Sequence, residues 1–365
     1  MSLITNRLKA FSGVLIALLS LTISAFAGHG EGETFDPGKT ITSHIGDAHD
    51  WHLWGHTSIP LPVIVFSKER GLDVFMSSHF HHGEMAHRGY MIKDNSIVAV
   101  NELEDIPAEE ATINEELTAQ LWDISITKNV ASLLISVFLI CWIFISVARA
   151  YTRNPNSPPR GLQSLIEPII LFVRDDVIKT SIGPKYEKYL PYLMTAFFFI
   201  WFNNLLGLVP VFPGGANLTG NIAVTLVLAL LTFLVTTFSA NKNYWHHIFA
   251  MPGVPAWVLV LLTPIEILGV FLRPFVLMIR LFANVTAGHI IILSFFSLIF
   301  IFGDGGKNMA AGYGVGIVSL VFTVFMSCLE LLVAFLQAYV FTLLSSIYIG
   351  AAVEEHHGHD AAHSY

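Results

Sequence analysis

The sequence has little charge and almost no cysteine. Charged residues make up 13% of its 365 residues and hydrophobic residues 54%, whereas an average soluble domain has about 25% charged residues. Too few charges remain to solvate a globule of this size, so much of the apolar surface should face lipid. The two cysteines, Cys141 and Cys328, both lie inside apolar runs, which excludes a disulfide-stapled scaffold and a Cys-rich metal module.

A basic cluster is also missing. The net charge is −8, which makes nucleic acid an unsuitable partner. Seventeen of the 27 acidic residues fall between Glu31 and Asp123, together with only five Lys or Arg. Residues 190–353, in contrast, hold seven charged residues in all. The chain therefore divides into an acidic front and an apolar back.

The first 27 residues have the pattern of a signal peptide. Arg7 and Lys9 precede an apolar run over residues 10–21, and Ala25-Phe26-Ala27 supplies a small-x-small cleavage pattern. An uncleaved first anchor is the alternative, but the run is short for a span of about 20 residues. Either interpretation indicates a bacterial export route and places the acidic front outside the cytoplasmic membrane.

Residues 28–128 are predicted to form a small extracytoplasmic region. Alternation such as that over residues 61–66 indicates one or two short strands, and the Glu-rich run over residues 107–123 indicates a surface helix. Nine of the 16 histidines lie here, among them His79, His81, His82 and His87. Imidazole suits zinc, but the spacing is irregular and no cysteine accompanies them. A polar cap with water-exposed histidines is the alternative.

The apolar back predicts an all-α polytopic membrane protein of about five spans. Arg149, Arg153 and Arg160 follow the first span, so that end should face the cytoplasm, with the mature N-terminus outside and the C-terminus inside. Pro264 and Pro274 are expected to divide residues 254–302 into a short re-entrant element and a long tilted helix. The predicted segments are a first transmembrane helix at 129–150, a cytoplasmic loop and interfacial helix at 151–188, a membrane channel domain at 189–353 with spans at 189–209, 222–238, 274–302 and 315–353, and a cytoplasmic tail at 354–365.

Four ionisable residues lie in this apolar back without polar flanks: Glu266, Arg273, Arg280 and Glu330. A charge at membrane depth costs at least about 2.5–3.5 kcal/mol, and arginine cannot relieve this cost by losing its proton. Arg280 must therefore meet a carboxylate, water or carbonyl groups, whereas Arg273 is placed where it could reach the membrane surface. Glu266, Arg273 and Arg280 are spaced by sevens, but Pro274 is expected to break a helix that carries all three.

The last two helices are joined by a short loop and should be antiparallel. The first presents Arg280, Asn284 and His289, and the second presents Glu330 and Gln337. At a rise of about 1.5 Å per residue, Arg280 comes level with Gln337 while His289 comes level with Glu330. Both His289 and Glu330 can titrate, so the pair suits proton relay; a static buried ion pair is the alternative.

Several motifs resemble one known family. Residues 280–289 (RLFANVTAGH) are similar to the core motif of subunit a of ATP synthases, the stator channel of the Fo sector. The likeness continues in residues 336–341 (LQAYVF), 202–210 (FNNLLGLVP) and 219–226 (TGNIAVTL). It covers roughly residues 189–355, so it does not reach the acidic front.

The resemblance implies a proton-translocating subunit without a catalytic site or a cofactor of its own. Arg280 would face the ring of c subunits, with Asn284 and Gln337 as polar neighbours. The pair of His289 and Glu330 would belong to the external half-channel and Glu266 to the cytoplasmic path. The implied partners are the c-subunit ring, b-type peripheral stalk subunits, other ATP synthase subunits and the lipid bilayer. Gly207 departs from the pattern, because some bacterial members have an acidic residue there.

Two other functions are compatible with a polytopic membrane protein. A self-contained proton-coupled secondary transporter predicts inverted repeats and a midplane pocket, but the sequence has no paired halves. An interaction protein that uses its spans as an anchor would not need four costly ionisable groups in the apolar back.

Overall fold

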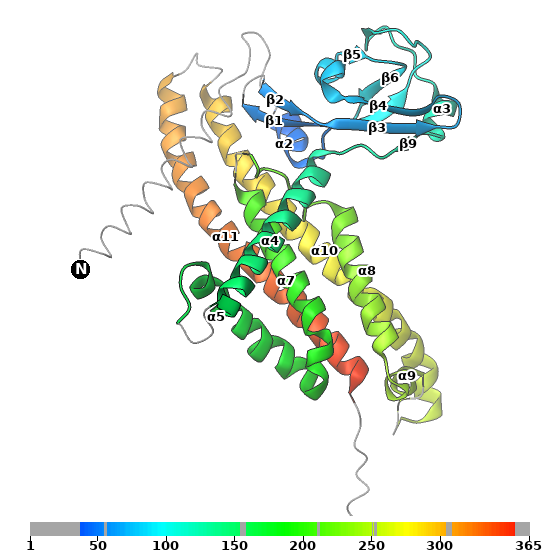
Figure 1. The fold of residues 1–365 in the computed structure, drawn as a ribbon, viewed down its shortest axis with the longest axis vertical. Coiled ribbons are helices and arrows are strands. Elements are labelled where there is room, and N and C mark those ends of the chain that lie inside the picture. Colours follow the sequence, from blue (N-terminus) through cyan, green and yellow to red (C-terminus); the bar gives the residue numbers. More distant parts are fainter. Residues whose placement is uncertain are drawn as a thin grey trace, which may run out of the picture. The chain divides into compact units, whose positions relative to one another are not determined.

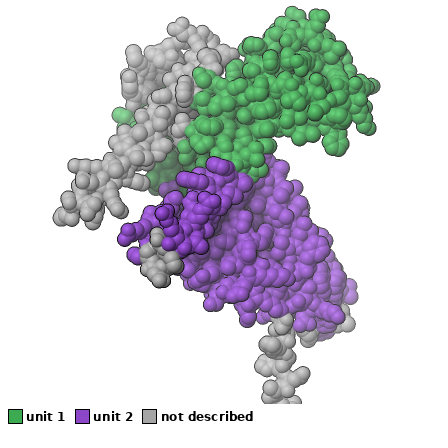
Figure 2. All heavy atoms as spheres, in the orientation of Figure 1, with its two compact units in different colours: residues 1–136, 205–218, 288–328 green, residues 137–204, 219–287, 329–365 purple. Residues whose placement is uncertain are grey.

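The computed structural model describes residues 37–54, 57–153, 158–209, 212–249, 251, 254–303 and 309–354. The predicted signal peptide at 1–27 lies outside these residues, as does the tail beyond residue 354. The described chain separates into two compact units (Figure 2). Unit 1 comprises residues 1–136, 205–218 and 288–328, and unit 2 comprises residues 137–204, 219–287 and 329–365.

Short strands build the cap of unit 1. They pair as β1–β2, β4–β3–β9, β5–β8 and β6–β7, and every pairing is antiparallel. The elements are α2 (Pro37–Ile45), β1 (Asp50–Trp54), β2 (Thr57–Pro60), β3 (Pro62–Ser67), β4 (Gly71–Met76), η1 (Ser77–Gly83), β5 (Met85–Ala86), β6 (Tyr90–Lys93), β7 (Ser96–Ala99), β8 (Ile106–Pro107), α3 (Glu115–Ala119) and β9 (Trp122–Asp123).

The strand predicted over residues 61–66 is confirmed as β3. Its side chains alternate, so that Val63 and Val65 are buried against Phe75, Phe80 and Tyr90 in the cap core. This alternation is what a strand with one face on a core requires.

The helix predicted over residues 107–123 is wrong. Only Glu115–Ala119 is helical, and it begins where the Asn114 side chain accepts a hydrogen bond from the Leu117 amide at 2.9 Å. Before it, Thr112 donates its amide and its hydroxyl to the Glu102 carboxylate. These bonds to a distant loop replace the bonds that a longer helix would make.

Long helices follow the cap (Figure 1). They are α4 (Lys128–Arg153), α5 (Leu162–Phe172), the π-helical η2 (Val173–Lys179), α6 (Thr180–Ile182), η3 (Gly183–Lys185), α7 (Tyr186–Leu208), α8 (Ile222–Ser239), α9 (Lys242–Phe249), α10 (Ala256–Gly303) and α11 (Met309–Val353). Among the described residues, five helical segments are long and apolar enough to cross a membrane: Lys128–Arg153, Leu162–Leu208, Ile222–Ser239, Trp257–Ile299 and Gly314–Val353. The prediction of a helical, polytopic membrane protein with about five spans is confirmed.

The predicted break at Pro274 is wrong. α10 is one helix of 48 residues that contains both Pro264 and Pro274. Each proline removes one backbone donor, but membrane helices tolerate proline because hydroxyl side chains, water and local adjustments satisfy the freed carbonyl groups. The residues on either side of Pro274 therefore belong to one helix.

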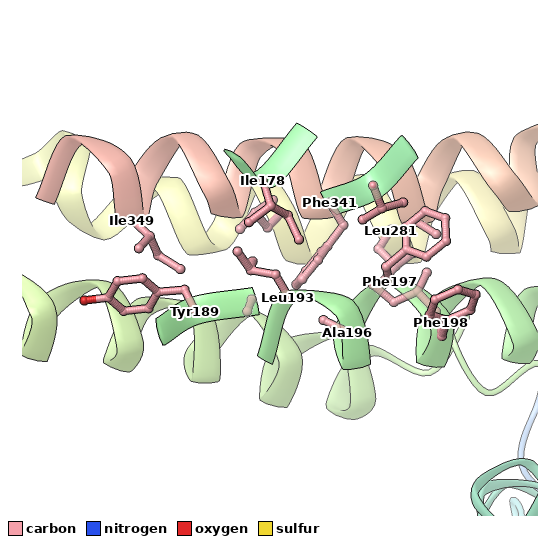
Figure 3. Close-up of a cluster of buried hydrophobic side chains, with 14 of the residues drawn as sticks. Ile178, Tyr189, Leu193, Ala196, Phe197, Phe198, Leu281, Phe341 and Ile349 are labelled. Carbon is pink, nitrogen blue, oxygen red and sulfur yellow. The ribbon is translucent and has the colours of Figure 1, made fainter. Parts of the chain in front are cut away.

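Unit 2 is organised around one stripe of α7. Tyr189, Leu193, Ala196, Phe197 and Ile200 recur at helical spacing and are all buried. Figure 3 shows side chains of α7 and α11 that point toward one another across this cluster, with Leu281 of α10 beside them. The stripe thus fixes α10 and α11 against α7 within unit 2.

Close backbone approach also holds unit 2 together. A Cβ atom on Gly350 would collide with the carbonyl oxygen of Ser181. Small residues at such contacts let membrane helices approach closely. Gly269 in α10, in contrast, has open space where a Cβ would be.

These two glycines predict stability changes of opposite sign. Gly350→Ala forces α11 away from Ser181, at a cost of about 1–3 kcal/mol for overpacking. Gly269→Ala meets no atom and raises helix propensity, so it stabilises by about 0.5–1 kcal/mol. Thermal unfolding of the purified protein in one detergent measures both. A Gly350→Ala variant that is as stable as Gly269→Ala would contradict the close contact.

Candidate functional site

One stripe of α10 carries three ionisable residues. Glu266, Arg273 and Arg280 are seven residues apart on a single helix. Seven residues turn a helix by about 700°, which is close to two full turns, so the three share one face at intervals of about 10 Å. Because α10 continues through Pro274, the three residues lie on one helix. The position of Pro274 in the sequence had predicted a break between them.

Arg280 lies on the exposed side of α10. Its neighbours Leu277, Met278 and Leu281 are buried in unit 2, whereas Arg280 and Asn284, one turn apart, are both exposed. In the part of the chain that the structure describes, Arg280 forms no salt bridge. A permanent positive charge is therefore presented outward from an apolar helix without a neutralising acid from its own described chain.

Arg273, one stripe position away, is held differently. Its guanidinium donates to the Tyr244 hydroxyl of α9 at 3.2 Å and lies 5.4 Å from the ring centroid of Tyr348 in α11. These three residues line a small cavity together with Thr232 and Thr236 of α8. The sequence suggested that Arg273 could reach the membrane surface; its aromatic partners come from other helices and carry no local signal.

On α11, Glu330 and Gln337 are both buried and lie seven residues apart on one face. Leu281 and Phe341 belong to the same cluster of unit 2 (Figure 3), so α10 and α11 approach each other close to Arg280 and Gln337. That Arg280 is level with Gln337 stays a prediction.

A hydrogen-bond network supports α11 beside Gln337. The Asn204 amide of α7 donates to the Ala334 carbonyl at 3.2 Å. The Thr219 hydroxyl donates to the Asn204 side-chain oxygen at 2.6 Å. Asn204 and Thr219 both belong to the motifs that the sequence singled out, and the structure gives them a positioning role.

His289 lies in unit 1, on the half-buried side of α10. A Cβ on Gly207 would be 3.6 Å from the Nε2 atom of His289 and 3.5 Å from the Ala216 carbonyl. The glycine therefore leaves room for about one small group beside the imidazole. The predicted pairing of His289 with Glu330 joins the two units and stays a prediction.

The histidines of the cap form pairs. His79 stacks on His87 with ring centroids 4.3 Å apart, and a ring nitrogen of His87 lies 2.8 Å from the Asp105 carboxylate. A ring nitrogen of His82 is 3.0 Å from Asp50. Within the described ranges, no three His, Cys, Asp or Glu side chains are arranged to hold a metal ion.

The fold and the site define a class: a polytopic helical membrane protein with an arginine on one face of a long helix that forms no salt bridge with the described residues. Residues 130–350 match the family described as ATP synthase A chain, and residues 40–124 match a domain of unknown function. Because the first match covers more than half of the sequence, the chain belongs to the ATP synthase A chain family. It is a proton-translocating subunit of the Fo sector, and its partners are other ATP synthase subunits.

Relatives from bacteria extend the likeness to the cap. The chain is 38% identical to ATP synthase subunit a 2 of Chlorobaculum tepidum, over 97% of this chain and 95% of the relative. It is 37% identical to ATP synthase subunit a of Chlorobium phaeobacteroides, over 98% and 97%. The protein of that name from Chloroherpeton thalassium is 42% identical over 66% of this chain and 72% of its own length. The first two alignments include the acidic front, which the motifs alone did not reach.

Acid should weaken the cap. The hydrogen bond from His87 lowers the pKa of Asp105 below its ordinary value, and the hydrogen bonds from Thr112 do the same for Glu102. A carboxylate whose pKa is lowered by folding stabilises the fold above its unfolded pKa of about 4 and loses that contribution as the pH falls through its folded pKa.

Hydrogen exchange of cap amides, corrected for the intrinsic effect of pH, measures this loss. Protection should fall when the pH drops below about 4, and Asp105→Asn should reduce the pH dependence. Glu109→Gln, an exposed carboxylate in the same region, serves as the control. Equal pH dependence in Asp105→Asn and the unchanged protein would contradict a role for the His87–Asp105 pair.

Proposed function

We propose that this chain forms two half-channels that carry protons to and from the carboxylates of a c-subunit ring, with Arg280 as the barrier between them. Proton flow is then coupled to ring rotation and ATP synthesis, because protons cross the membrane only while they are bound to the ring carboxylates. The chain sits in the bacterial inner membrane, held beside the ring by b-type peripheral stalk subunits.

The exposure of Arg280 carries the proposal. Burying an unpaired guanidinium in lipid is costly and its charge cannot be removed. The described chain supplies no salt bridge to Arg280, so the compensating negative charge comes from another subunit. A carboxylate that moves past this face stays ionised while it is near the guanidinium, because opposite charges close together favour the charged form.

The same charge blocks a direct leak. A hydrated proton that approached Arg280 along the stripe would meet a permanent positive charge in a medium of low dielectric constant, where repulsion is strong. Protons therefore leave the external half-channel only by binding to a ring carboxylate, which they neutralise.

The two half-channels lie on opposite sides of Arg280. His289 and Glu330 form the external path, and both side chains can take up and release a proton. Glu266, on the Arg280 stripe of α10, belongs to the cytoplasmic path. Asn284 and Gln337 are the polar neighbours that position water or the ring carboxylate beside Arg280.

Basic residues give the orientation. Arg149 and Arg153 lie in the last turns of α4, and Lys242 begins α9 after α8. By the positive-inside rule, both ends face the cytoplasm. The signal peptide at 1–27 is then removed, the cap at 28–128 lies outside, the loop at 151–188 and the tail at 354–365 lie inside, and the helix at 129–150 and the channel domain at 189–353 span the membrane.

Replacement of Arg280 tests the proposal. In the complete ATP synthase reconstituted into vesicles, Arg280→Ala should abolish ATP-driven proton pumping and ATP synthesis, because ring carboxylates lose their ionising partner. Arg149→Ala, an exposed arginine at a helix end, should retain both activities. Coupled transport at the unchanged rate in Arg280→Ala would contradict the proposal, and uptake of a solute by the chain without a ring would indicate a secondary transporter instead.

A further inference from the structure

A polar cluster of buried, half-buried and exposed side chains lies where the cap of unit 1 meets α4. It consists of Asp47 after α2, His49 before β1, Asp123 of β9, and Lys128 and Asn129 in the first turn of α4; we name it the junction cluster. His49, Lys128 and Asn129 are each less than 9% exposed. Buried charged and polar side chains are costly unless they are satisfied, so this concentration requires an explanation.

Part of the cluster is structural. The Asp47 carboxylate accepts hydrogen bonds from the backbone N–H of Asn129 at 3.0 Å and from the Thr127 hydroxyl at 2.8 Å. Asp47 thus binds a free N–H group at the start of α4, as the side chain of an N-cap residue does. The Lys128 amide donates to the Ala48 carbonyl at 2.8 Å. These bonds fix the start of α4, but they do not use the side chains of His49, Lys128 or Asn129.

Two buried atoms in the cluster have no hydrogen-bond partner within the described residues: the Nδ1 atom of His49 and the Oδ1 atom of Asn129. The other ring nitrogen of His49 lies 3.4 Å from Asp123. Buried polar atoms of this kind normally bind a protein group or an ordered water. Two such atoms in one cluster make it a place where ordered water can bind.

The cluster also reaches the proton path. Lys128 interacts electrostatically with Asp47 and Asp50 on the cap side and with His289 on the membrane side. All four residues belong to unit 1, in which Gly207 leaves space beside the His289 imidazole. Lys128 is therefore within electrostatic range of both the acidic cap and His289, the first titratable group of the proposed external half-channel.

The polar character continues along α4. Asn129, Ser132 and Ser136 are spaced by three and four residues and are all buried, so they share one helix face. Leu134 and Phe138, on the other side of the helix, are exposed. Ser136 donates to the Leu133 carbonyl of its own helix, and the polar face leads along α4 from the junction cluster.

We propose that the junction cluster is the external entrance of the proton path, through which protons pass from the water around the cap to His289. The acidic cap raises the local concentration of protons at this mouth. A proton from external water reaches the exposed Asp123 carboxylate and passes to Nε2 of His49, and another leaves the buried Nδ1 for water inside the cluster, so the imidazole returns to its neutral form and the number of protons is conserved. This assigns a task to the segment that matches a domain of unknown function, and it rests on the half-channels proposed above.

Lys128 is a positioning residue in this entrance. Its charge offsets those of Asp47 and Asp50. Protons therefore pass the entrance without being trapped there.

The dependence of ATP synthesis on external pH tests the entrance. The complete complex is reconstituted into vesicles, and the rate is measured after imposing a proton gradient at a series of external pH values. Asp123→Asn and Lys128→Gln should each shift the external pH of the half-maximal rate. Asp123→Asn should shift it toward acid by about 0.3 pH unit, because removal of one exposed charge at the mouth lowers the local proton concentration about twofold. Lys128→Arg should restore the original profile.

The second His–Asp pair of the cap provides a matched control. A ring nitrogen of His87 lies 2.8 Å from Asp105, which is exposed as Asp123 is, but this pair does not belong to the junction cluster. Asp105→Asn should leave the profile of ATP synthesis unchanged. Equal profiles for Asp123→Asn, Lys128→Gln, Asp105→Asn and the unchanged complex would overturn the proposal.

Thiol labelling tests the path without relying on charge. In a background with Cys141→Ser and Cys328→Ser, Ser132→Cys should react with a membrane-impermeant cationic methanethiosulfonate from the outside, and the reaction should block ATP synthesis. Leu134→Cys, on the exposed apolar face, should not react. Failure of Ser132→Cys to react in an assembled, active complex would overturn a water-filled entrance along α4.

The Arg280→Ala variant separates the two proposals. If it keeps coupled transport, the half-channel account is wrong. If it loses coupled transport while the junction variants keep the normal pH profile, only the entrance is wrong.

Discussion

The guanidinium of Arg280 cannot lose its proton, and it lies on a mainly apolar helix. Every other feature of the channel account depends on how this charge is compensated. Hydrophobic neighbours fix α10 with Leu277, Met278 and Leu281 inward, so Arg280 is held outward instead of folding into its own unit. An arginine in this position makes a subunit incomplete by itself, since the lowest-energy partner is a carboxylate that another chain supplies.

The position of Arg280 also explains why the helices of unit 2 are tightly packed. Within unit 2, the α7 stripe packs α7 against α10 and α11, the Asn204 network joins α7 to α11, and the close contact between Gly350 and Ser181 joins α11 to α6. Packing and small residues, in place of the hydrophobic effect, hold helices together in lipid. A barrier that must meet a moving partner repeatedly needs such a fixed support.

Much of the membrane part could be predicted from the sequence, because long apolar runs and basic loops act locally. The cap could not, since the pairing of its strands and the bonds from Thr112 to Glu102 join residues that are distant in sequence. The break at Pro274 was wrongly predicted because soluble helices rarely tolerate proline, whereas α10 continues through it. The tyrosine partners of Arg273 come from two other helices and left no pattern around Arg273 itself.

The most direct test is a cryo-electron microscopy structure of the assembled membrane sector. The account predicts that the Arg280 guanidinium faces a carboxylate of the neighbouring ring, with no acid of its own chain in hydrogen-bonding contact. An Arg280 side chain that instead reaches lipid headgroups, or that forms a salt bridge within its own chain, would contradict it.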